Sequence, residues 1–222
     1  MDSQNPPDMW YRRAVWAVFA LFVVMNSLWI SSAPGLMGDE GSEGENVYEL
    51  LTREGITVTG ERSYIGPLID YLRVPFILLF GYTTLAIRLP MLFFSFATFW
   101  LAEYVLRTLF GRWAGLYGLV ALTFTPIYIL YQRLGWTITL FPFFAFLILN
   151  ILLRNWKRKW LWAGLAGGLG LANHIIFLAT LAAAGLVGLG VFVKDALDQR
   201  EEGVKFQLKF FGVSFVEAAV GF

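Results

Sequence analysis

The stretch that decides the fold is residues 160–193, WLWAGLAGGLGLANHIIFLATLAAAGLVGLGVFV, in which no residue carries a formal charge. A single α-helix of this length would be about 50 Å long, whereas the hydrocarbon core of a bilayer is roughly 30 Å thick. Basic residues flank both ends, at 154–159 and from Lys194 onward, so both flanks are expected on the cytoplasmic side. The stretch therefore predicts two short transmembrane helices, at 160–173 and 175–193, joined by a turn near Asn173 and His174.

The rest of the chain has the same character. Of its 222 residues, 58% are hydrophobic and 18% aromatic, and the mean hydropathy is +0.63. A transmembrane helix needs roughly 20 apolar residues. Further spans are predicted near 14–32, 87–106, 113–132 and 134–153, and the start of another at 206–222. The chain contains no cysteine, which excludes disulfides, thiolate metal sites and cysteine nucleophiles.

Residues 67–80 decide the topology. The segment is apolar but short, it is interrupted by Pro75, and it carries Asp70 and Arg73. If it crossed the bilayer, the basic cluster at 154–159 would face outward. If it lies in the interface, 12 of the 17 basic residues are cytoplasmic, as the positive-inside rule requires.

We therefore expect one transmembrane domain over residues 1–222, with a cytoplasmic N-terminus and a first extracytoplasmic loop at 33–83. The protein is predicted to be an integral multi-pass protein of the plasma (inner) membrane. The last apolar stretch stops at Phe222 without completing a span. We expect that the natural chain continues or that this chain is a truncated product.

The loop at 33–83 is predicted to be ordered. Ser42 and Glu45 have the spacing of a capping box, which predicts a short amphipathic helix on the membrane surface from about residue 43 to 54. Asp39 and Glu40 come just before it. These two acids either mark the exit from the bilayer and favour a helix N-terminus, or they hold a carboxylate where a lipid headgroup and an acceptor hydroxyl meet.

Several short motifs follow one another in a distinctive order. They are Gly38-Asp39-Glu40 after the first span, Tyr48 on the surface helix, GPLIDY at 66–71, AIRLP at 86–90, Thr125-Pro126, RLGWT at 133–137, and the segment from Gly164 to His174. Together they resemble the GT-C membrane glycosyltransferases of the dolichyl-phosphate-mannose protein mannosyltransferase and aminoarabinose transferase superfamily. The resemblance implies an all-α membrane protein, a polytopic GT-C-like transmembrane helix bundle with surface helices in the first outer loop. Members are typically longer, which leaves the acceptor open.

The resemblance also implies a reaction. A glycosyltransferase of this type moves a hexosyl or pentosyl group from a polyprenyl-phosphate donor to an acceptor on the non-cytoplasmic face, with inversion. Asp39 would be the catalytic base. Arg88 and Arg133 would neutralise the donor phosphate, although interfacial snorkelling also explains both. Glu40 and Tyr48 are further candidates for substrate binding.

His174 is the only histidine of the chain. It is a candidate to hydrogen-bond the phosphate, or to join Glu40 or Glu43 around a divalent cation, although a lone histidine at a helix end is more often structural. The metal ligands remain unknown, and no cofactor is predicted beyond a possible divalent cation. Glu103 lies inside a span, where Arg107 four residues later explains it as a local ion pair.

The expected partners are a lipid-linked sugar donor and membrane lipid. The basic cluster at 154–159 orients the chain in the membrane and does not indicate nucleic-acid binding. Two alternatives remain: a non-catalytic or truncated membrane protein of the same fold, and a transporter. A transporter is expected to have broken or charged spans near the midplane and repeated halves, and Pro142 is nearly the only such sign.

Overall fold

The computed structural model describes residues 8–52, 65–154 and 156–186. Its helices, in chain order, are α1 (Met9–Ser27), α2 (Gly38–Thr52), α3 (Leu68–Phe80), α4 (Thr84–Phe124), α5 (Pro126–Arg133), the 3₁₀ helix η2 (Thr137–Leu140), α6 (Phe141–Leu153) and α7 (Lys159–Asn173). A short apolar helix, Phe177–Leu186, follows. Over this part of the chain there is no β-strand, only an isolated bridge between Ile65 and His174. The predicted all-α class is confirmed.

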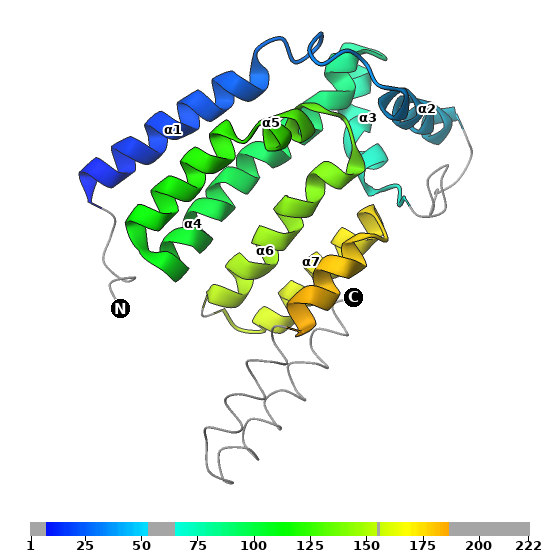
Figure 1. Cartoon of the computed structure of the whole chain (residues 1–222). Helices are drawn as coiled ribbons and strands as arrows, with labels where there is room; N and C mark the ends of the chain where they lie inside the picture. The colour runs from blue at the N-terminus through cyan, green and yellow to red at the C-terminus, as the bar shows by residue number, and fades with distance from the viewer. Residues whose placement is uncertain (1–7, 53–64, 155, 187–222) are drawn as a thin grey trace.

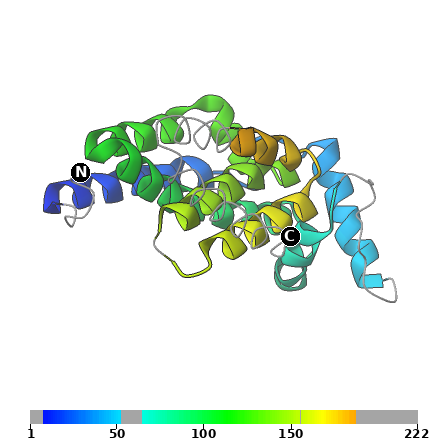
Figure 2. The same cartoon turned by 90° about the horizontal axis from the view of Figure 1, so that it is seen from below.

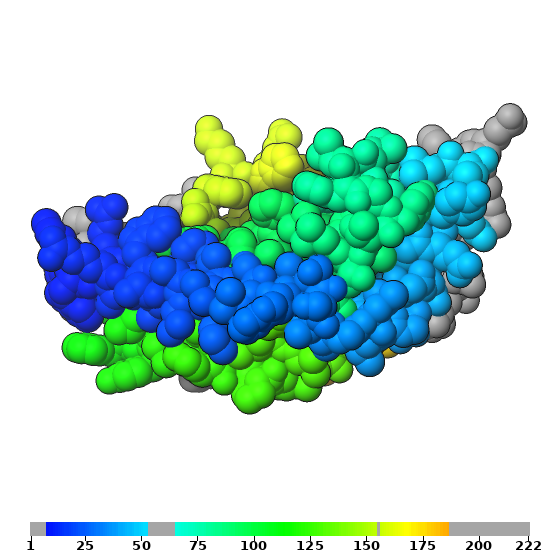
Figure 3. All heavy atoms as spheres, turned by 90° about the horizontal axis from the view of Figure 1, so that it is seen from above, coloured from blue at the N-terminus to red at the C-terminus, as the bar shows by residue number. Residues whose placement is uncertain are grey.

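The long helices run beside one another as a bundle (Figure 1). Helix α4 contacts α1, α3, α5 and α6, and α6 contacts α7. Helices α2, α3 and α5 gather at one end, which we call the α2 end (Figures 1 and 2). Seen from above, α2 and α3 lie next to each other beyond the C-terminal end of α1 (Figure 3).

Helix α4 consists of two arms that meet at Gly111, where φ is 86° and ψ is 173°. Glycine adopts this conformation without a steric penalty. The two arms run antiparallel and in close contact: a Cβ atom at Gly115, in the second arm, would lie 3.3 Å from Cα of Arg107 in the first. The predicted spans 87–106 and 113–132 therefore fall in antiparallel segments, the second of which is interrupted by Thr125 between α4 and α5.

Apolar packing holds the bundle together. One buried cluster joins α1 to both arms of α4 through residues that include Phe22, Phe99 and Leu119. Many large apolar side chains of the same helices remain exposed, among them Trp16, Phe93, Trp113 and Tyr117. Soluble proteins rarely expose so much apolar surface, whereas lipid covers it in a membrane.

Thr84–Phe124 is the one helix among the described residues that is long and apolar enough to cross a membrane. Pro126–Arg133 and Thr137–Leu153 pass the same test only as a pair, and that pair is bent by 116°. Helix α3 has 13 residues and so extends about 20 Å, which is short for a span. The number of spans and the side of each loop stay predictions.

The helix bounds differ from the expected segments in three places. Helix α1 begins at Met9 and ends at Ser27, earlier than the predicted 14–32, and the expected span at 134–153 is divided between a turn, η2 and α6. Helix α2 begins at Gly38, not at 43. Ser42 does not cap it, because its hydroxyl donates to the Gly38 carbonyl within the helix (3.4 Å). The predicted end of this helix, at 53–54, lies outside the described residues.

We predict that Gly66→Ala destabilises the fold. A Cβ atom at Gly66 would lie 1.6 Å from the carbonyl oxygen of Ala172, and the N–H of Gly66 donates to the Asn173 carbonyl (3.1 Å). Overpacking costs about 1–3 kcal/mol, or roughly 2–12 °C in Tm at this chain length. Thermal unfolding in detergent measures the loss. Gly41→Ala is the control, because a Cβ there meets nothing within 4 Å. Equal Tm values for the two variants would contradict the prediction.

Candidate functional site

The buried face of α2 carries two acids. Glu40 and Glu43 are three residues apart, which places them on the same side of a helix. Glu40 is 0% exposed and Glu43 is 5% exposed, whereas Asp39 is exposed on the same helix. Since buried carboxylates need partners, the α2 end must supply donors for both.

Glu40 receives four hydrogen bonds. Arg88 donates to it twice, from Nε to Oε1 (2.7 Å) and from Nη2 to Oε2 (2.6 Å). The backbone N–H groups of Gly135 (2.7 Å) and Met37 (3.1 Å) donate as well. Burial acts to raise the pKa of Glu40, but these hydrogen bonds outweigh it and hold the pKa below its ordinary value. Glu40 is therefore an ionised structural anchor.

The remaining N–H groups of Arg88 donate to backbone carbonyls. Nη1 donates to Ile30 (2.8 Å) and Pro34 (2.9 Å), and Nη2 donates to Gly35 (3.2 Å). A guanidinium has five N–H donors, so all of them are used inside the protein. Arg88 was expected to meet a donor phosphate, and in this geometry it has no donor left for one.

Arg73 makes a second pair with α2. Its Nη1 donates to Glu43 and to Asp70 (3.1 Å to Asp70 Oδ1), and its Nη2 donates to the carbonyl of Gly135. Glu43 also accepts the N–H of Thr137 (3.3 Å). Glu40 and Glu43 thus hold the same short segment, residues 134–137, which we call the 134–137 turn.

The 134–137 turn is the meeting point of the α2 end. The carbonyl of Thr137 accepts a hydrogen bond from Asn173 Nδ2 (2.8 Å), which adds α7 to the elements that hold it. Gly135 is required there, because a Cβ atom would lie 2.6 Å from Cγ2 of Ile87 and 3.3 Å from Oε1 of Glu40. Elements far apart in the sequence are fixed together through one stretch of backbone.

Asp70 shares Arg73 with Glu43. Burial raises the pKa of Asp70 to about 7, and the nearby charge of Glu43 adds to this, whereas Arg73 opposes it. One guanidinium faces two carboxylates here, so protonated Asp70 leaves the group electrically neutral.

His174 closes the turn after α7. Its Nδ1 accepts the N–H of Ile176 (3.1 Å), and its ring meets Phe141 edge-on at 5.6 Å. Burial lowers the pKa of His174, and Glu43 opposes the shift. Because Nδ1 is an acceptor, the neutral ring carries its proton on Nε2. Among the residues that the structure describes, no three His, Cys, Asp or Glu side chains gather to hold a metal ion, and a role of His174 beside Glu40 or Glu43 stays a prediction.

Arg133 differs from Arg88. It is half-buried, and it donates to the carbonyls of Met25 (3.2 Å) and Leu28 at the C-terminal end of α1. Nη1 and Nη2 each make one of these two hydrogen bonds, and Nε is buried without a partner. Because each Nη carries two N–H groups, one N–H on each remains for a ligand. Tyr48 is 54% exposed on α2, with its ring 5.8 Å from that of Tyr82.

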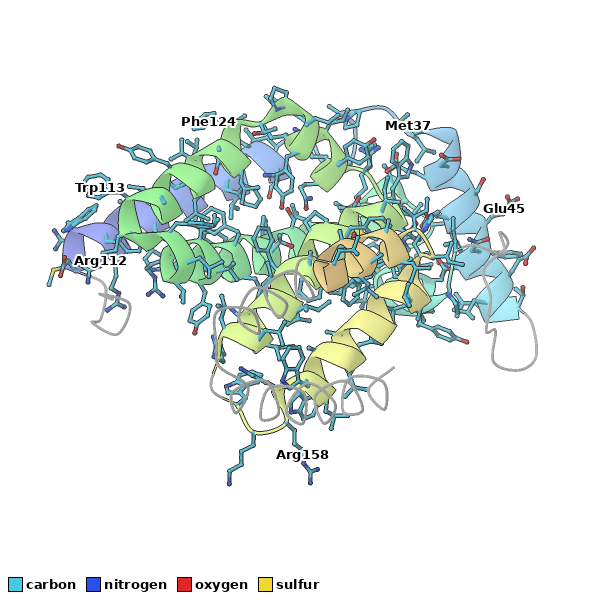
Figure 4. All side chains as sticks on the ribbon, turned by 60° about the horizontal axis from the view of Figure 1, so that its bottom comes forward. Met37, Glu45, Arg112, Trp113, Phe124 and Arg158 are labelled. Carbon is cyan, nitrogen blue, oxygen red and sulfur yellow. The ribbon has the colours of Figure 1, made fainter. Side chains whose placement is uncertain are left out.

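Sequence reasoning missed the partnership of Glu43 with Arg73. The available signal was the pair of charges at Asp70 and Arg73 inside an apolar segment, which indicated an interfacial position but not a partner. In Figure 4, Arg112 and Arg158 lie far from Met37, just before α2, and from Glu45 within α2.

We predict that protonation of Asp70 stabilises the fold. With a folded-state pKa of about 7 against an ordinary 3.8, the stabilisation is complete below pH 4 and is lost as pH rises through 7. Tm measured in detergent from pH 5 to pH 8 should fall for the wild type and stay nearly level for Asp70→Asn. Glu45→Gln, an exposed acid on α2, should keep the wild-type slope. A wild-type slope in Asp70→Asn would refute the assignment.

Comparison with known proteins identifies the family of this chain. Residues 65–196 match the family model of the dolichyl-phosphate-mannose-protein mannosyltransferases, which is more than half of the chain. The matched segment contains Arg73, Arg88, the 134–137 turn and His174. No curated protein and no solved structure matches the chain. The chain belongs to the dolichyl-phosphate-mannose-protein mannosyltransferase family, and it is a membrane glycosyltransferase of the GT-C type.

Proposed function

We propose that this glycosyltransferase moves a hexosyl or pentosyl group from a polyprenyl-phosphate donor to an acceptor hydroxyl on the non-cytoplasmic face, with inversion, and that Asp39 is the base. The observation that carries the proposal is the division of the acidic pair. Glu40 is fully buried and held by four hydrogen bonds, whereas its neighbour Asp39 is exposed in the first turn of α2. A base needs such a fixed position at the surface.

The reaction is a single displacement. The acceptor oxygen forms a bond to C1 of the sugar while the bond from C1 to the phosphate oxygen breaks. The electron pair leaves with the polyprenyl phosphate, and the hydroxyl proton passes to Asp39. One displacement from the side opposite the leaving group inverts C1.

Arg133 is proposed to neutralise the leaving phosphate. It is half-buried, and each of its Nη atoms makes one hydrogen bond and retains one N–H, whereas all five donors of Arg88 are engaged. We assign Glu40 and Arg88 to positioning: they hold the start of α2 and the loop before it. Tyr48 and His174 stay predictions as substrate contacts.

The side of the membrane follows from charge. Arg112 at the α4 turn and Arg158 before α7 lie far from α2 in Figure 4. Under the positive-inside rule these basic segments are cytoplasmic, so we propose that the α2 end is non-cytoplasmic and the N-terminus cytoplasmic.

We expect Asp39→Asn to reduce transfer by about 10²–10⁴-fold, because general-base catalysis contributes a factor of that size. The assay uses the full-length purified protein, radiolabelled polyprenyl phosphate mannose and a membrane extract as acceptor source. Glu45→Gln, another exposed acid of α2, should transfer at the wild-type rate. A folded Asp39→Asn with normal transfer would remove Asp39 as the base, and a wild type inactive with every sugar donor would remove the function itself.

Substitutions of Arg88 and Arg133 should affect different properties of the protein. Arg88→Gln leaves buried Glu40 without its partner, which costs about 3–5 kcal/mol and lowers Tm by roughly 6–20 °C. Arg133→Gln removes hydrogen bonds only to the Met25 and Leu28 carbonyls, so it should lower Tm less than Arg88→Gln does, and it should raise the donor KM through weaker binding of polyprenyl phosphate. Tm in detergent and the donor dependence of the rate separate the two. An unchanged donor KM in Arg133→Gln would contradict its assignment.

A further inference from the structure

Two arginines fix the loop between α1 and α2. Arg133 donates to the carbonyl of Leu28 at the start of the loop. Arg88 donates to the carbonyls of Ile30, Pro34 and Gly35 further along it. A segment with no regular secondary structure of its own is thus held at both ends. The same loop leads directly into the turn of α2 that carries Asp39.

Trp29 has an unusual conformation within this loop. Its φ is 53°, in the left-handed region that is costly for any residue with a Cβ atom and rare for a bulky one. Its carbonyl accepts the N–H groups of Ser32 (3.0 Å) and Ala33 (2.8 Å), which hold the conformation. The side chain is nevertheless 71% exposed, so the strain is not offset by burial of the ring.

The ring of Trp29 also lacks the ring contacts that Trp16 and Trp113 have. Trp16 packs on Trp100 at 4.7 Å, and Trp113 packs on Trp10 at 5.0 Å. No ring contact involves Trp29 within the described part of the chain. The loop therefore presents a large aromatic surface that no ring of the described residues contacts.

We propose that Trp29 is a contact for the sugar of the lipid-linked donor, an inference that rests on the proposed function. Arg133, the assigned phosphate ligand, is bonded to the residue just before Trp29. In a polyprenyl-phosphate sugar, C1 is bonded to a phosphate oxygen, so the sugar lies beside any group that binds the phosphate. The C–H groups on one face of a hexose pack on an indole ring while its hydroxyls stay in water.

This placement joins the parts of the site. One loop carries the ring and leads to the proposed base Asp39, and the two arginines that hold the loop are the phosphate ligand and the partner of Glu40. The competing role for an exposed tryptophan at this depth is an interfacial anchor, which would need neither a strained backbone nor a fixed loop.

The test replaces Trp29 with glycine, which adopts a positive φ without strain and so removes the ring while sparing the loop. With full-length protein and radiolabelled polyprenyl phosphate mannose, we expect Trp29→Gly to raise the donor KM about tenfold. The value of kcat should change less than about twofold, which is small beside a tenfold effect, and Tm should not fall. Trp29→Phe should recover most of the affinity. Trp113→Ala, an exposed tryptophan distant from α2, should keep the wild-type KM (Figure 4).

A second measurement identifies what the ring touches. Equilibrium binding of polyprenyl phosphate without sugar should be the same in Trp29→Gly and wild type. Equal weakening for both ligands would assign the ring to the prenyl chain and overturn the sugar contact. An unchanged KM, with transfer by the wild type intact, would overturn the contact and leave the proposed function standing. A wild type that neither binds nor transfers any sugar donor would overturn both.

Discussion

The buried ion pair between Glu40 and Arg88 is the constraint on which the α2 end depends. Taking two charges out of water is expensive, and their attraction offsets the cost only when the remaining donors and acceptors are satisfied. Here they are satisfied: Arg88 also holds three carbonyls of the loop after α1, and Glu40 accepts two backbone N–H groups. The pair therefore links α4, α2, the loop and the 134–137 turn. Loss of either partner would leave a charge buried without its partner, which is strongly destabilising.

The pair of Glu43 with Arg73 repeats this construction one helical turn further along α2. Both glutamates receive N–H groups from the 134–137 turn, and Arg73 donates to the carbonyl between those two N–H groups. The apolar cluster at this end, around Val47, Ile77 and Ala86, is small, whereas the bundle below is packed with aromatic rings. Charge pairing thus does at the α2 end what apolar packing does in the bundle. A polar scaffold has directional bonds, which suits a region that must hold a surface carboxylate in one place.

How much of this could be predicted depends on the range of each interaction. The apolar runs near residues 14–32, 87–106 and 160–173 correctly predicted helices. The pattern of residues that become buried in lipid or in a core is visible in the local sequence. The start of α2 was placed too late, since the capping-box spacing at Ser42 is a local signal and the contact of Glu40 with Arg88 is not. The partnership of Glu43 with Arg73 spans 30 residues and crosses from α2 to α3, so no local pattern could give it. The family motifs named Asp39 as the base and Glu40 and Arg88 as substrate contacts, but they did not show that the two acids are divided between the surface and the interior.

That division follows from helix geometry. Successive residues of an α-helix point about 100° apart, so a buried Glu40 turns Asp39 toward the surface. The more firmly Glu40 is held, the less freedom remains to its neighbour, so a buried residue positions the proposed base. The same reasoning separates the arginines. Arg88 is fully buried with every donor engaged, whereas Arg133 is half-buried and each of its Nη atoms makes a single hydrogen bond. In a site built from charged side chains, groups whose hydrogen bonds are all made within the protein hold the structure in place. Groups with unused donors or acceptors are the ones that can bind a ligand.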